Sequence, residues 1–185
     1  MSTNVETQVS RVIVSPRQAT QLFEVVETII EEALECARMK IPPIRQEQDL
    51  DILFQQHNFF CTFKYGLADG IGRVIGDYDV NVLEIHLFEP CANPDFQSEE
   101  DMPIDGTINL ILVVSSPTAG LEAFIASLDR SLTQSLKELP LPILAAYDSV
   151  LNAILVTKKD LERGKGHAAL VTSIFTPPLK VWQRL

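Results

Sequence analysis

The spacing of apolar residues predicts two long amphipathic helices. After Ser15 and Pro16, apolar side chains recur every three or four residues as far as Ala37, which is the repeat of one helix face. A serine followed by a proline favours a helix start, because the serine caps the first turn and proline fits the first helical position. The same pair recurs at Ser116 and Pro117, before apolar positions that continue to Leu139. We therefore expect helices over residues 16–39 and 117–139.

Shorter apolar segments favour β-strands. The most continuous run, residues 107–115, predicts a buried central strand. Runs rich in β-branched and aromatic residues predict further strands at 9–14, 59–65, 72–75, 77–88, 152–157 and 167–175, although the apolar stretch 143–156 also suits a helix. Asp69-Gly70 predicts a turn, and the imperfect alternation within 80–88 indicates a bulge or a two-sided strand. Thr157 and Asp160 have the spacing of a capping box, so we expect a short helix there that ends at Gly164.

These elements predict an α+β fold: a largely antiparallel sheet of five or six strands packed by two long helices. With 185 residues, of which 46% are hydrophobic, the chain can bury one core, and we expect a single domain over residues 1–185. Residues 90–106 are acidic and contain three prolines, which is typical of an exposed loop. Residues 176–185 are expected to form an extended C-terminal tail.

Charge is unevenly distributed along the chain. The formal net charge is −10, and the stretch between Arg73 and Arg130 contains acidic residues but no lysine or arginine. Residues 158–185 are instead basic. The overall negative charge opposes binding to a phosphate backbone, so nucleic acid is not expected as a partner. No apolar run has the length of a membrane span, and the three cysteines include no close pair, so we expect a cytoplasmic protein without a membrane partner.

Two segments could bind an anion. Arg163, Lys165, Gly166 and His167 form a glycine-rich basic loop suited to phosphate, carboxylate or an acidic peptide, although the full phosphate-binding loop pattern is absent. Ser115 and Ser116 lie where a strand enters a helix, and such a junction offers backbone N–H groups to an anion. In both segments the alternative is purely structural, as solvated lysines or as an ordinary helix cap.

The chain offers one weak combination of metal ligands. His57, Cys61, His86 and Cys91 are residue types that bind tetrahedral zinc, but their spacing does not match a zinc knuckle. Core cysteines and surface histidines are the simpler interpretation, so we expect neither a metal nor a cofactor.

No complete catalytic motif occurs, which favours a non-enzymatic function. We expect an acidic binding or assembly module that forms a homo-oligomer, most simply a homodimer, and engages a protein partner. In the order of its elements and its acidity, the chain resembles small acidic secretion chaperones. The alternative is a sensor or enzyme that holds an anionic small molecule with the basic loop at 163–167.

Overall fold

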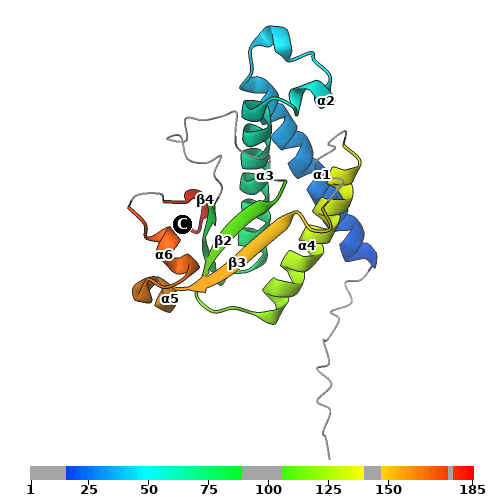
Figure 1. Ribbon diagram of the computed structural model, residues 1–185. Coiled ribbons are helices and arrows are strands. Elements are labelled where there is room, and N and C mark those ends of the chain that lie inside the picture. The colour runs from blue at the N-terminus through cyan, green and yellow to red at the C-terminus, as the bar shows by residue number, and fades with distance from the viewer. Residues whose placement is uncertain (1–15, 89–105, 140–146, 175–176) are drawn as a thin grey trace, which may run out of the picture.

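The computed structural model describes residues 16–88, 106–139, 147–174 and 177–185. Within them, one four-stranded sheet has long helices on one face and two short helices on the other (Figure 1). The strands are β1 (Val82–Leu87), β2 (Ile108–Val114), β3 (Leu151–Thr157) and β4 (Leu179–Gln183), in the order β3-β2-β1-β4. The mixed α+β fold is therefore confirmed. The described residues contain four strands rather than five or six; the predicted strand at 9–14 and most of the loop at 90–106 lie outside them.

Three long helices, rather than the predicted two, occupy the described chain. They are α1 (Pro16–Met39), α3 (His57–Tyr78) and α4 (Ala119–Lys137). The short helices η1 (Pro43–Arg45) and α2 (Leu50–Leu53) connect α1 to α3. None of the described helices is both long enough and apolar enough to cross a bilayer.

Helix α3 replaces the strands predicted at 59–65 and 72–75 and the turn predicted at Asp69-Gly70. Its side chains at every fourth position are almost fully buried, and they form one face of the helix: Phe59, Phe63, Leu67, Ile71 and Ile75. The strand prediction was wrong because the aromatic residues have β-propensity, whereas the spacing of four that runs through them indicates a helix.

Two glycines let α3 approach α1 closely. A Cβ on Gly66 would lie 2.9 Å from the Cα of Ala33, and one on Gly70 would lie 2.7 Å from a methyl carbon of Ile29. Neither position has room for a larger side chain without a shift of the helices. Close packing against α1 therefore explains glycines that are unfavourable inside an isolated helix.

The order β2-α4-β3 forms a parallel crossover unit. Strand β2 is central and almost entirely buried, as predicted for 107–115. It pairs in parallel with β3 and antiparallel with β1, and β1 pairs antiparallel with β4. The cap of α4 is Thr118, which accepts a hydrogen bond from the amide of Leu121, rather than the predicted Ser116.

The C-terminal segment, expected as an extended tail, forms edge strand β4. The register of β1 shifts against both neighbours, which confirms the bulge predicted within 80–88. Trp182 of β4 packs on Gly76 of α3, where any Cβ would overlap the indole ring. The guanidinium of Arg184 donates to the carbonyls of Gly76 and Asp79, which ties the end of the chain to the end of α3.

The other face of the sheet is covered by α5 (Lys158–Arg163) and α6 (His167–Val171), on the left in Figure 1. The capping box of Thr157 and Asp160 is confirmed, and so is Gly164 at the C-cap with a positive φ of 58°. The strand predicted at 167–175 was wrong, because its first residues form α6. Ala168 of α6 is buried among Ile111, Val113 and Val156 of the sheet.

Candidate functional site

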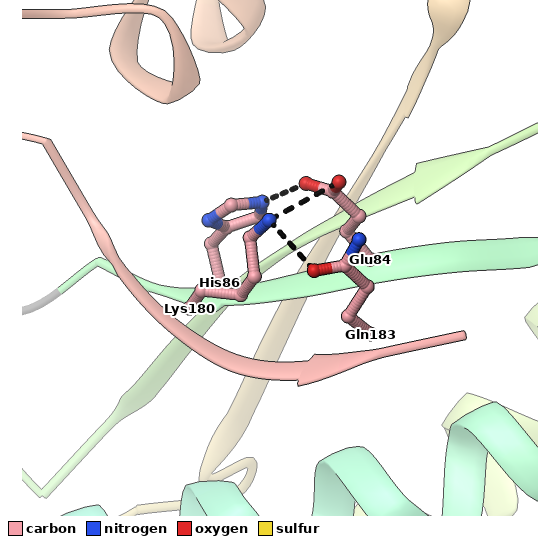
Figure 2. Close-up of polar contacts among 4 residues, drawn as sticks. All are labelled: Glu84, His86, Lys180 and Gln183. Atoms are coloured by element: carbon pink, nitrogen blue, oxygen red, sulfur yellow. Dashed lines mark hydrogen bonds and ion pairs between the residues drawn. The ribbon is translucent and has the colours of Figure 1, made fainter. Parts of the chain in front are cut away.

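A polar cluster lies where β1 meets β4, on the sheet face opposite the long helices (Figure 2). Nε2 of His86 lies 3.0 Å from Oε2 of Glu84. The ammonium of Lys180 lies 3.2 Å from the other carboxylate oxygen of Glu84. It also donates a 3.1 Å hydrogen bond to the side chain of Gln183. Glu84 thus joins a buried imidazole to a half-exposed ammonium.

The net effect of burial and the neighbouring charges is to lower the pKa values of both His86 and Glu84. Burial lowers the pKa of His86, and its contact with Glu84 only partly opposes that effect. Burial alone would raise the pKa of Glu84, but hydrogen bonds from His86 and Lys180 outweigh it and hold that pKa below its ordinary value. At neutral pH we therefore expect a neutral imidazole beside an ionised carboxylate.

The contacts of His86 stay within the pair of strands β1 and β4. A histidine oriented by a carboxylate is a common arrangement for proton transfer. Nδ1 of His86, however, is buried without a hydrogen bond. The backbone of Pro178 raises the pKa of His86 slightly, which does not outweigh burial. In the described part of the chain, the contacts of Glu84 and His86 lead to Lys180 and on to Gln183. We interpret the cluster as a link between β1 and β4.

The junction predicted to bind an anion already holds a carboxylate of this chain. The hydroxyl of Thr118, at the start of α4, donates a 2.9 Å hydrogen bond to Asp79. Ser115 donates to the side-chain oxygen of Asn81 at 2.9 Å, and Ser116 lies 3.5 Å from the same atom. The amide of Asn81 in turn donates to Asp79 and lowers the pKa of that carboxyl. The serines therefore belong to an internal network beside a negative charge, which disfavours a second anion.

The basic loop is exposed and separate from that network. Arg163 ends α5, Gly164 and Gly166 both have positive φ, and His167 begins α6. Arg163, Lys165 and His167 are exposed, and their side chains make no hydrogen bond or salt bridge within the described ranges. Nothing in their packing directs them to a common point. Anion binding at Arg163, Lys165, Gly166 and His167 stays a prediction.

The candidate metal ligands are only partly brought together. His57 and Cys61 lie one turn apart on α3, with 3.4 Å between Nε2 and Sγ. His86 is instead engaged with Glu84 in the sheet, and Cys91 lies outside the described residues. Among the residues that the structure describes, no group of three or more His, Cys, Asp or Glu side chains could hold a metal ion.

The two edges of the sheet differ in how they are protected. Edge strand β4 has five residues, follows Pro177 and Pro178, contains Lys180 and is bulged against β1. Prolines, charges and bulges all discourage an edge strand from pairing with another chain. Edge strand β3 has seven residues, LNAILVT, with no charge, no proline and an unbroken register against β2. Its edge has none of these protections.

The register of β3 identifies which of its backbone groups face away from the sheet. The amide of Ile108 donates to the carbonyl of Val150, and Ile108 is aligned with Leu151. In a parallel pair this alternation continues, so that Asn152, Ile154 and Val156 bond to β2. The backbone groups of Leu151, Ala153, Leu155 and Thr157 therefore point outward.

Two carboxylates occupy the ends of this outward row. The amide of Leu151 donates to Asp129 of α4 at 2.8 Å, and the amide of Thr157 donates to Asp160 of α5 at 2.9 Å. Between them, the outward amides and carbonyls of Ala153 and Leu155 have no hydrogen-bond partner in the described chain. We define these two residues as the open edge.

The open edge was not among the residues selected from the sequence. The strand itself was predicted at 152–157, and its lack of charge is visible in the printed sequence. Its position at the edge depends on how β2, β1 and β4 pair, which no local pattern reports. Asp129 was missed for the same reason, because its partner amides are 21 and 22 residues away.

Comparison with known proteins adds no assignment: the chain matches no protein-family model, no curated protein and no solved structure.

Proposed function

We propose that this protein is a non-enzymatic assembly module that adds an extended strand of a protein partner to β3. The observation that carries the proposal is the open edge at Ala153 and Leu155, which lies in an uncharged, β-branched strand. An edge of this kind pairs with an extended segment through main-chain hydrogen bonds.

The chemistry of β3 defines the partner segment. Because β3 has no charged residue, an ion pair within the strand could not select a charged peptide. Ile154 and Leu155 are only partly buried and lie on opposite faces of the sheet. An added strand with apolar residues would extend both apolar surfaces. We therefore expect the partner to offer an uncharged, extended and largely apolar segment.

The charge of the rest of the molecule is compatible with this function. A net charge of −10 disfavours nonspecific association between copies, so an unprotected edge need not cause aggregation. The amides of Leu151 and Thr157 are already bonded, which limits pairing to the middle of the strand. Such a short edge suits specific addition of one strand.

The proposal is tested with a fluorescent peptide that copies residues 149–159, used as a surrogate strand. Its binding to the intact protein is compared with binding to Ala153→Pro, in which the outward amide is lost while the amides that bond to β2 remain. Saturable binding that is lost in the variant is the expected result. Equal binding to both proteins, or none to either at concentrations where the protein and the peptide are both monomeric, would overturn the proposal.

The alternative function, binding of an anionic small molecule at residues 163–167, has no supporting contact in the described structure and stays a prediction.

A further inference from the structure

We infer that the strand added to β3 is β3 of a second copy, paired antiparallel about a two-fold axis at Ile154. This inference rests on the proposed function and names its partner. It would join two four-stranded sheets into one continuous sheet. Dimers with two-fold symmetry place the same surface of both copies in contact, so the edge must be complementary to itself.

The open edge is self-complementary in its backbone groups. Ala153 and Leu155 both point outward and lie on either side of Ile154. With Ile154 opposite Ile154 of the second copy, Ala153 of each copy faces Leu155 of the other. Residues facing in this way exchange two N–H···O bonds in an antiparallel ladder. All four open amides and all four open carbonyls of the dimer would then be paired.

Neighbouring registers satisfy fewer groups. An axis at Ala153 would place Leu155 opposite Leu151, whose amide is already bonded to Asp129. The carbonyl of Leu155 would then lack a donor. An axis at Leu155 would place Ala153 opposite Thr157, whose amide is bonded to Asp160, and would leave the carbonyl of Ala153 without a donor. Only the axis at Ile154 pairs every open amide and carbonyl of Ala153 and Leu155 while the amides of Leu151 and Thr157 stay bonded to Asp129 and Asp160.

The charges at the two ends of β3 also favour this orientation. The strand begins beside Asp129 and follows exposed Asp148, and it runs directly into exposed Lys158 and Lys159. Antiparallel pairing brings the start of one strand to the end of the other, which places Asp148 of one copy at the same end of the interface as Lys158 and Lys159 of the other, while Asp129 and Asp160 stay bonded to amides of their own copy. A parallel arrangement would place like charges together.

The axis can be tested by disulfide trapping of a single position. In the predicted dimer the two copies of residue 154 form a non-hydrogen-bonded pair, with Cα atoms about 4.5 Å apart, a separation that a disulfide can span. Ile154→Cys is made in the full chain with Cys36, Cys61 and Cys91 replaced by serine. Oxidised glutathione is the oxidant, and each disulfide formed consumes one molecule of it and releases two molecules of glutathione.

The matched control is Asn152→Cys in the same background. Residue 152 lies on the same strand and the same face, but the predicted register places it opposite residue 156, so its two copies are too far apart to bond. We expect a disulfide dimer from Ile154→Cys at least ten times faster than from Asn152→Cys. Addition of Ala153→Pro to Ile154→Cys should remove this difference. Equal rates at 152 and 154, or no dimer at either position in folded protein, would overturn the inference.

The outcomes separate the inference from the proposed function. If the surrogate peptide binds and is blocked by Ala153→Pro, but Ile154→Cys forms no dimer, strand addition stands and the second copy is not the partner. The β-prone segment at 9–14 would then be the next strand of this chain to test. If the peptide also fails to bind, both ideas are wrong.

Discussion

Asp129, in the middle of α4, accepts a 2.8 Å hydrogen bond from the amide of Leu151, the first residue of β3. The same carboxylate oxygen accepts a second bond, at 2.9 Å, from the amide of Val150. One helical side chain thus satisfies two backbone donors where β3 begins. It also marks where the open edge starts, because the next outward amide, that of Ala153, has no such acceptor in the described chain.

The first prediction concerns this carboxylate. Asp129→Ala would leave two partly buried amides without an acceptor and should lower the free energy of unfolding by about 1–3 kcal/mol. Asp129→Asn keeps a side-chain oxygen and should recover most of that loss. Urea denaturation of the three proteins provides the measurement. If the alanine and asparagine variants were equally stable, the hydrogen bonds would not be the reason for the loss.

The second prediction tests the direction of the backbone groups in β3. Asn152→Pro removes an amide that bonds to β2 and should lower the free energy of unfolding by about 1–3 kcal/mol. Ala153→Pro removes an outward amide and should cost clearly less at a concentration where the protein is monomeric. Thermal and urea unfolding compare the two. A larger loss from Ala153→Pro would show that the assigned alternation is wrong.

The third prediction concerns the contact between α3 and β4. Gly76→Ala would place a methyl group into the ring of Trp182, and overpacking of this kind costs about 1–3 kcal/mol. Gly120→Ala in α4 is the matched control, because no atom lies within 4 Å of the added Cβ. It should be neutral or stabilise the protein by about 0.4–1 kcal/mol. Equal effects at both positions would contradict the described packing.

The fourth prediction follows from the lowered pKa of His86. Since the folded state holds this pKa below its ordinary value of 6.5, the unfolded chain binds the proton more readily. The contribution of His86 to stability is therefore complete above that value and is lost as the pH falls below it. The free energy of unfolding should decrease from about pH 7.5 to about pH 5.5. In His86→Gln this decrease should be smaller, and an unchanged pH dependence would mean that His86 is not its source.

Glu84 responds in a lower pH range. Its pKa is also lowered in the folded protein, so its contribution is present above its ordinary value of 4.5 and is lost as the pH falls through the folded value. Acid should thus lower the free energy of unfolding in two stages, first at His86 and then at Glu84.

Local signals in the sequence were sufficient for several elements. The serine–proline start and the apolar repeat predicted α1, and the continuous run of apolar residues predicted the central strand β2. Thr157, Asp160 and Gly164 predicted both ends of α5, because capping depends on residues three or four positions apart. Each of these features is decided by neighbours in the sequence.

Features that depend on distant contacts were not predictable in the same way. The glycines of α3 are an example, because Gly66, Gly70 and Gly76 are explained only by the close approach of Ala33, Ile29 and Trp182. Ser115 and Ser116 were candidates for anion binding until Asn81 and Asp79, more than 30 residues earlier, were found beside them. The edge position of β3 likewise follows from strand order alone.

Amide hydrogen exchange measures the open edge residue by residue and tests it most directly. In dilute protein we predict fast exchange at Ala153 and Leu155 and slow exchange at Asn152, Ile154 and Val156, which bond to β2. As the protein concentration rises, exchange at Ala153 and Leu155 should become slow together, whereas Ala153→Pro should leave Leu155 fast. Slow exchange at both residues in the monomer, or fast exchange at every concentration and with the surrogate peptide present, would contradict the account.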